Sequence, residues 1–121
     1  MKIALLITTV LAIASCSNTG TNSAAAIDPA AARDLIAAKA VVLDVREPDE
    51  YASGHLEAAK NIPVDTVSEN LAEIERLVGG DKTKPIVVYC ASGVRAATAK
   101  ATLEAHGFTH VVDGGGYRDL K

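Results

Sequence analysis

Val41-Val42-Leu43-Asp44-Val45 is a nearly continuous run of β-branched and aliphatic residues. Such a run is typical of a strand that is buried on both faces of a sheet. Ile86-Val87-Val88-Tyr89 repeats the pattern further along the chain. The segments between the predicted strands have helical patterns and contain no Asn-Gly hairpin turn. Helical connections of this kind join strands that are parallel. The sequence therefore predicts an α/β fold with a mostly parallel sheet.

The remaining elements follow from capping residues, apolar spacing and turn residues. Asp28-Pro29 predicts the start of a helix, because a carboxylate can cap a helix and proline fits its first position. Further helices are predicted over residues 48–53, 67–77 and 95–106, and short strands over residues 60–62 and 110–112.

The composition fits one domain. The 121 residues are 49% hydrophobic and 3% aromatic, so the core must come from closely packed Val, Leu, Ile and Ala. The formal net charge is −3, whereas a nucleic-acid-binding surface needs clustered Lys and Arg. A nucleic-acid partner is therefore not expected.

The first 16 residues have the composition of a targeting segment. Lys2 gives a positive start, residues 3–13 are almost wholly apolar, and Ala14-Ser15-Cys16 ends the run. This stretch resembles a bacterial lipoprotein signal, which implies cleavage before Cys16 and a lipid on its sulfur. The apolar run is shorter than the about 20 residues that a membrane helix needs. An ordinary signal peptide that is cleaved a few residues later, and an uncleaved anchor, are the alternatives.

This resemblance divides the chain into three parts. Residues 1–15 are the expected signal peptide, residues 16–26 a lipidated cysteine with a polar, flexible tether, and residues 27–121 the folded domain. We expect an exported lipoprotein on the periplasmic side of a bacterial membrane, held there only by its lipid. Ser17 after the cysteine is consistent with sorting to an outer membrane. No feature of the sequence indicates an oligomeric state.

Three segments that follow predicted strands are expected to meet, namely residues 44–46, 90–95 and 113–116, because the carboxyl ends of parallel strands share one edge of a sheet. Cys90 lies between a buried strand and the first turn of a helix, where inward-pointing N–H groups and the positive helix end favour a thiolate. Gly93 allows the loop to take a positive φ and to curl around an anion on that sulfur. A reactive thiolate is one interpretation, and a small apolar residue that ends its strand is the other.

The stretch Cys90-Ala91-Ser92-Gly93-Val94-Arg95 resembles the Cys-x-x-Gly-x-Arg loop of the rhodanese sulfurtransferases. Other marks of that family are similar to stretches of this chain, namely Asp44-Val45-Arg46-Glu47, Glu50-Tyr51, Gly54-His55-Leu56, Asn61-Ile62-Pro63 and Gly114-Gly115. The resemblance covers residues 27–121, which look most like the small periplasmic rhodaneses of the phage-shock type. It implies a three-layer fold with a mostly parallel sheet of about five strands flanked by helices.

The family's chemistry implies roles for the loop residues. Cys90 would attack the outer sulfur of thiosulfate or of a persulfide donor, and would carry it as a persulfide to cyanide or a thiol. The negative charge would be cradled by the backbone N–H groups of Ala91, Ser92, Gly93, Val94 and Arg95. Sulfite leaves as an anion, so no histidine base is required. The sequence has neither zinc-ligand spacing nor a nucleotide-binding loop, and no metal or other cofactor is expected.

Several polar residues have roles that the sequence leaves open. Arg95 faces the substrate in one interpretation and binds a loop carboxylate such as Glu50 in the other. Asp44 and Arg46 are expected to support the edge of the loop rather than to take part in catalysis. His55 is expected to be a hydrogen-bonded packing residue.

Two other classes of protein compete with the sulfurtransferase. A cysteine-dependent phosphatase or arsenate reductase would also need an anion cradle after a strand, but related phosphatases have one more residue between Cys and Arg than this loop has. A non-catalytic rhodanese-like module that binds a partner protein would not need Cys90 in a complete loop. The loop has no basic residue between Cys90 and Arg95, whereas some rhodaneses have Arg or Lys there. The sequence therefore favours sulfur transfer more strongly than it favours thiosulfate as the donor.

Overall fold

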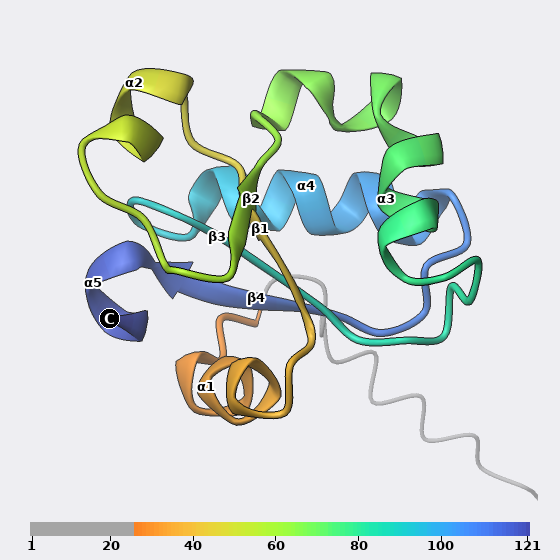
Figure 1. Cartoon of the computed structure of the whole chain (residues 1–121), viewed down its shortest axis with the longest axis horizontal. Helices are drawn as coiled ribbons and strands as arrows, with labels where there is room; N and C mark the ends of the chain where they lie inside the picture. Colours follow the sequence, from red (N-terminus) through yellow and green to blue (C-terminus); the bar gives the residue numbers. More distant parts are fainter. Residues whose placement is uncertain (1–25) are drawn as a thin grey trace, which may run out of the picture.

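Four parallel strands form one sheet in residues 26–121, the part of the chain that our computed structural model describes (Figure 1). Their order across the sheet is β2-β1-β3-β4. The strands are β1 (Val41–Asp44), β2 (Ala59–Asn61), β3 (Ile86–Cys90) and β4 (Val111–Gly116). The predicted parallel α/β fold is confirmed, with four strands in this part of the chain where about five were expected.

Helices cover both faces of the sheet, which gives the expected three layers (Figure 1). One face carries α1 (Pro29–Ala37) and α5 (Tyr117–Leu120). The other face carries η2 (Val64–Glu69), α3 (Leu71–Leu77) and α4 (Val94–Ala105). The short helix α2 (Pro48–Ala52) follows the carboxyl end of β1.

Alternate residues of β3 point to opposite faces of the sheet. Val87 and Tyr89 pack in the cluster that includes residues of α1 and α5, whereas Val88 and Cys90 pack in the cluster that includes residues of α4 and η2. All residues of β3 are fully buried, as its apolar run predicted. The side chain of Cys90 therefore lies on the α4 face of the sheet.

The predicted start of α1 is confirmed. The Asp28 carboxylate accepts a hydrogen bond of 3.0 Å from the N–H of Ala31, and Pro29 is the first helical residue. The N–H of Asp28 donates to the carbonyl of Asp113 at 2.8 Å, and Ile27 forms a parallel bridge with Asp113. The described part of the chain thus begins alongside β4.

The helix predicted over residues 67–77 is divided in two. η2 is a 3₁₀ helix that ends at Glu69, and α3 begins at Leu71. Between them Asn70 has φ −112° and ψ 18°, and its side-chain amide donates to the carbonyl of Thr66 at 2.8 Å. An asparagine side chain that bonds the preceding turn competes with continued helix, which explains the break.

The last strand is longer than predicted. Three glycines after Asp113 are typical of a turn, so the sequence indicated residues 110–112, but β4 starts at Val111 and continues to Gly116. Val88 pairs with Asp113 and Cys90 pairs with Gly116, so two steps along β3 match three steps along β4. This bulge of one residue brings the glycines alongside the end of β3.

The predicted signal peptide, the lipidated Cys16 and nearly all of the tether lie outside the described residues. Among residues 26–121, no helix is long and apolar enough to cross a membrane. The first strand-like backbone pairing among the described residues is the parallel bridge between Ile27 and Asp113 of β4.

Candidate active site

The carboxyl ends of β1 and β3 lie side by side at the point where the strand order reverses. The chain goes from β1 to β2 on one side, and from β3 to β4 on the other. In open parallel sheets, such a switch point leaves a crevice at the carboxyl edge, where ligands bind. Cys90, the last residue of β3, lies at this edge. The expected meeting of the three segments is confirmed, because Asp44 pairs with Tyr89 and Cys90 pairs with Gly116.

The sulfur of Cys90 lies inside the loop that follows its strand. The residue has no exposed surface, and Sγ accepts a hydrogen bond of 2.9 Å from the N–H of Gly93. Gly93 has a left-handed φ of 96°, which suits a loop that curls back toward the sulfur. A Cβ at Gly93 would also lie 2.6 Å from the Cδ1 of Ile27 and 3.2 Å from the Cα of Gly115, so the Ile27 side chain would have to move. The loop therefore requires glycine at this position.

The start of α4 adds further N–H groups close to the sulfur. The helix begins at Val94, and the first N–H groups of a helix have no partner within it. Together with the helix dipole, these groups favour negative charge near the helix start. We call residues 90–95 the Cys90 loop. Ala91, Ser92 and Val94 are exposed, so the outer side of the Cys90 loop is open to solvent.

The glycines of β4 form a wall against which the Cys90 loop packs. Gly116 pairs with Cys90, and a Cβ on Gly116 would overlap the carbonyl oxygen of Ala91. Gly115 has a φ of 86°, and its Cα lies 3.2 Å from the position that a Cβ on Gly93 would occupy. Backbone therefore packs directly on backbone, which is feasible only because these positions lack side chains.

Arg95, the last residue of the Cys90 loop, binds a carboxylate in this structure. Its Nη1 and Nη2 donate to Oε1 and Oε2 of Glu50 at 2.6 and 3.1 Å. The hydrogen bonds from Arg95 lower the pKa of Glu50 to about 2. Of the two interpretations of Arg95 that the sequence left open, the geometry matches the ion pair with Glu50.

Comparison with known proteins identifies the family of this arrangement. The sequence model of the rhodanese-like domain matches residues 28–119, which is almost all of the described chain. The chain belongs to the rhodanese-like domain family.

Two kinds of enzyme are found among the relatives of this rhodanese domain. Thiosulfate sulfurtransferase PspE of Escherichia coli (strain K12) is 37% identical over 78 residues, which are 64% of this chain and 71% of that protein. The tRNA uridine(34) hydroxylase of Sodalis glossinidius (strain morsitans) is 39% identical over 79 residues, which are 64% of this chain and 22% of that protein. The chain thus corresponds to most of the sulfurtransferase but to less than a quarter of the hydroxylase.

Solved structures share the rhodanese fold. A rhodanese with anions from E. coli has a TM-score of 0.59 and 36% identity, and the match covers 66% of this chain and 89% of that chain. The human single-domain sulfurtransferase TSTD1 has a TM-score of 0.60 and 28% identity, and this match covers 74% of this chain and 88% of that chain. Each match covers about two thirds or more of this chain, so the likeness extends well beyond a single motif.

The Asp44–Arg46 pair is buried in the rhodanese domain and joins several of its segments. Arg46 donates from Nε to Oδ1 of Asp44 at 3.0 Å and from Nη2 to Oδ2 at 2.7 Å. Its Nη2 also donates to the carbonyl of Gly54 at 2.7 Å. The guanidinium carbon lies 5.7 and 4.8 Å from the ring centroids of Tyr89 and Tyr117. These contacts connect β1, the segment after α2 and the start of α5, which is the geometry of a structural ion pair.

His55 is exposed, and its contacts are with Tyr51 on the neighbouring turn. Its ring stacks on Tyr51 with the centroids 3.7 Å apart, and its Nδ1 lies 2.9 Å from the carbonyl oxygen of Tyr51. In the described residues, no three His, Cys, Asp or Glu side chains are grouped so that they could hold a metal ion.

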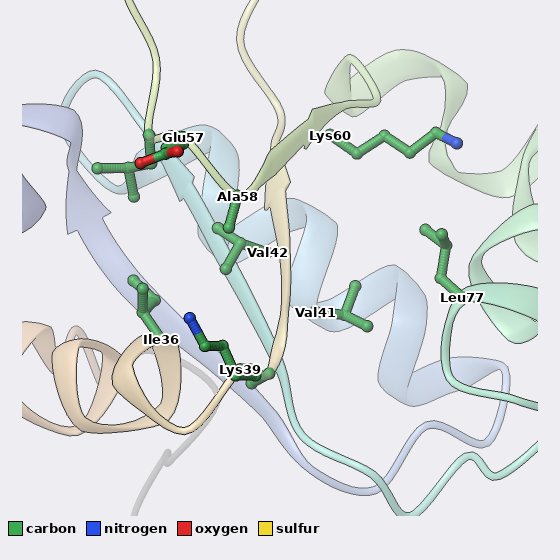
Figure 2. A pocket seen from close by; sticks show the side chains of 10 residues that line it. Ile36, Lys39, Val41, Val42, Glu57, Ala58, Lys60 and Leu77 are labelled. Carbon is green, nitrogen blue, oxygen red and sulfur yellow. The ribbon is translucent and has the colours of Figure 1, made fainter.

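A groove lies along β1 and β2 (Figure 2). It has a volume of about 660 Å³ and is lined by Val41 at the start of β1, by Ile36 of α1 and by Leu77 of α3. Among the described residues that line it, none belongs to the Cys90 loop. The groove is therefore separate from the candidate active site.

Two residues beside the Cys90 loop received no role from the sequence. Ile27, 47% exposed, packs against Gly93, and a single apolar residue ahead of a helix gives no signal of such a contact. Asp113 is buried and accepts a hydrogen bond of 2.8 Å from the N–H of Gly115. A charged residue that interrupts an apolar strand directly before three glycines was the available signal for Asp113.

Proposed function

We propose that the protein is a sulfurtransferase that carries a sulfane sulfur on Cys90. The Cys90 thiolate attacks the outer sulfur of thiosulfate or of a persulfide donor. The sulfur–sulfur bond of the donor breaks, and sulfite or a thiolate leaves with the electron pair. The product is a Cys90 persulfide whose terminal sulfur carries the negative charge.

The second step returns the enzyme to its starting form. A thiolate or cyanide attacks the terminal sulfur of the persulfide and takes it. The Cys90 sulfur leaves as a thiolate. The two steps together move one sulfur atom from donor to acceptor, and neither step consumes an oxidant or a reductant.

The hydrogen bond from the Gly93 N–H to the Cys90 sulfur is the observation that carries this proposal. It is 2.9 Å long and directs a backbone donor at the reacting atom. Further N–H groups of residues 91–95 would stabilise the charge of the persulfide and of the transition state. Because these donors belong to the backbone, they are in place before any substrate binds. The match to 71% of the E. coli thiosulfate sulfurtransferase supports the same chemistry.

For the residues outside the structure, we propose a lipoprotein signal that is cleaved before Cys16. The positive start, the apolar run of residues 3–13 and the small residues before the cysteine support this proposal. The lipid would hold the domain on the periplasmic side of a bacterial membrane, with residues 17–26 as a tether.

The mass of the intact, purified protein tests the proposed chemistry. Thiosulfate or an organic persulfide should add one sulfur atom to the wild-type protein, and cyanide should remove it. Cys90→Ser should gain no sulfur, because its hydroxyl does not form a persulfide. Sulfur uptake by Cys90→Ser equal to that of the wild type, or no uptake by the wild type from any of these donors, would show that the proposal is wrong.

A further inference from the structure

Asp113 is a buried acid close to the Cys90 loop. It is 1% exposed and lies in β4, opposite Val88. Its Oδ1 accepts the N–H of Gly115 at 2.8 Å, whereas its Oδ2 is buried and has no hydrogen-bond partner among the described residues. Burial raises the pKa of Asp113, and the hydrogen bond from Gly115 and the charge of Lys100 on α4 counteract part of this effect. A buried carboxylate oxygen without a hydrogen-bond partner costs free energy, so the position of Asp113 asks for an explanation beyond packing.

The hydrogen bond between Asp113 and Gly115 spans the bulge of β4. The bulge lies between the pairs Val88–Asp113 and Cys90–Gly116, and it leaves one more residue on β4 than on β3. The extra residue of a bulge has no partner in the neighbouring strand. The carboxylate of Asp113 supplies the acceptor that the strand does not, and it does so for a glycine with a φ of 86°.

The glycines that this hydrogen bond holds are those that face the Cys90 loop. Gly115 lies against Gly93, whose N–H donates to the sulfur. Gly116 lies so close to Ala91 that a Cβ would overlap the Ala91 carbonyl oxygen. A slip of one residue in β4 would therefore place a different backbone surface against both Ala91 and Gly93.

We propose that Asp113 is a positioning residue for the Cys90 loop, because its carboxylate fixes the bulge that sets Gly115 against Gly93 and Gly116 against Ala91. Asp113 acts through the backbone of β4 and does not touch the sulfur donor. The kinetic part of the test rests on the proposed function, whereas the hydrogen-exchange part does not.

The kinetic test compares Asp113→Ala with Asp113→Asn. Alanine removes the acceptor for the Gly115 N–H, whereas asparagine keeps a carbonyl oxygen in its place. Misplacement of a reacting group by about 1 Å lowers rates by up to about 10²-fold. We expect Asp113→Ala to lower the rate constant of persulfide formation at saturating donor by about 10- to 100-fold, with little change in the half-saturating donor concentration. Asp113→Asn should restore the rate to within about threefold of the wild type.

Asp81→Ala is the matched control. The Asp81 carboxylate accepts the N–H of Thr83 at 2.9 Å, with the same two-residue spacing, but it lies ahead of β3 at the end away from Cys90. This variant should react at the wild-type rate. All rates are measured well below the unfolding temperature of each variant, so that lost stability is not read as lost activity. If Asp113→Ala does not fold, Asp113→Ser replaces it, because a hydroxyl makes the same turn bond more weakly.

Amide hydrogen exchange tests the positioning role without any sulfur chemistry. In Asp113→Ala, the amides of Gly93 and Gly115 should exchange faster, whereas the amides of α1 should exchange at the wild-type rate. Asp113→Asn should return the exchange of Gly93 and Gly115 to the wild-type rate. The proposal is overturned if Asp113→Ala forms the persulfide and exchanges its amides at the wild-type rates. It is also overturned if Asp113→Ala and Asp113→Asn lose the same amount of activity and of amide protection. If the wild type forms no persulfide but exchange follows the expected order, the proposed function fails and the positioning role stands.

Discussion

Both carboxylate oxygens of Glu50 accept hydrogen bonds from the guanidinium of Arg95, which lies 45 residues further along the chain. This ion pair joins α2 to the first turn of α4. Arg95 is the one basic residue of the Cys90 loop, and Glu50 compensates its charge. A dianionic donor such as thiosulfate therefore meets a loop whose side chains offer it no net positive charge.

We predict that Glu50→Gln improves the use of thiosulfate. Glutamine keeps an oxygen for the N–H of Glu47, which donates to Glu50 at 3.1 Å, but it leaves the charge of Arg95 uncompensated. The half-saturating thiosulfate concentration should fall by about 3- to 10-fold at low ionic strength, the size of one charge interaction near a protein surface, and the gain should shrink in high salt. Initial-rate kinetics check this, with Glu104→Gln on the exposed side of α4 as the control. A thiosulfate requirement that is unchanged in Glu50→Gln would mean that the ion pair does not limit donor binding.

A second prediction concerns the contact between Gly116 and the Cys90 loop. A methyl group at position 116 would overlap the Ala91 carbonyl, which belongs to the backbone and cannot rotate away. Gly116→Ala should lower the rate of persulfide formation by about 10²-fold and the free energy of unfolding by about 1–3 kcal/mol. Intact-mass measurements on quenched reactions give the rate of persulfide formation, and denaturant unfolding gives the free energy of unfolding.

Gly80→Ala separates lost stability from lost positioning. Gly80 has a φ of 80°, but no atom lies within 4 Å of its added Cβ. This variant should lose about 1–2 kcal/mol through backbone strain and keep its activity. If Gly116→Ala is as active as Gly80→Ala, the glycines of β4 do not position the loop.

The fold could be predicted where its signals are local. β1 and β3 lie within one residue of their predicted bounds, because a run of β-branched residues is itself the signal of a buried strand. The predicted end of β4 was wrong, because the true end depends on the pairing of Gly116 with Cys90. A glycine run contains no apolar pattern from which that pairing could be read.

The same distinction applies to the site. Cys90, Gly93 and the start of α4 are neighbours in the sequence, so their arrangement could be predicted from one loop. The partner of Arg95 could not be decided, because it depends on how close the fold brings α2. The bond from Gly115 to Asp113 depends on a bulge, which exists only once β4 pairs with β3.

The buried carboxyl group of Asp113 predicts a pH-dependent stability difference. Burial raises its pKa, so the folded protein holds this proton at pH values where the unfolded protein has lost it. The stability that the proton provides is complete below the unfolded pKa of about 3.9 and is lost as the pH rises through the folded pKa. Asp113→Asn has no such group. The free energy of unfolding of the wild type should therefore rise relative to that of Asp113→Asn as the pH falls from 7 toward 4.

Denaturant unfolding of both proteins at each pH measures this difference. Subtraction removes the contributions of groups that both proteins share, such as Glu50, whose lowered pKa acts in the opposite direction. A difference that stays constant over this range, or that moves in favour of Asp113→Asn at low pH, would contradict the raised pKa.

The lipoprotein proposal predicts that membrane association depends on one sulfur. Cys16→Ala removes the acylated atom, so the protein should move from the membrane fraction to the soluble fraction or stay unprocessed. Cys90→Ser is the matched control, because it also removes a thiol but should remain with the membrane. Cell fractionation and the mass of the mature protein check both variants. If Cys16→Ala stays in the membrane fraction with its signal removed, the lipid is not the anchor.

The last prediction is that the size of the Cys90 loop selects sulfur over phosphoryl chemistry. Four residues separate Cys90 from Arg95, and the N–H of Gly93 lies 2.9 Å from the sulfur, so we expect the N–H groups of the loop to be matched to one sulfur atom. An aryl phosphate has no room to place its phosphorus for in-line attack, so the wild type should turn over a sulfane sulfur donor and not an aryl phosphate. One Gly inserted after Gly93 widens the loop without adding a side chain, and it should lower sulfur transfer by about 10²-fold. Parallel assays with thiosulfate, a persulfide and an aryl phosphate on both proteins decide the matter. If the wild type hydrolyses the aryl phosphate rapidly and takes no sulfur from either donor, the protein is a cysteine phosphatase and the proposed sulfurtransferase function is wrong.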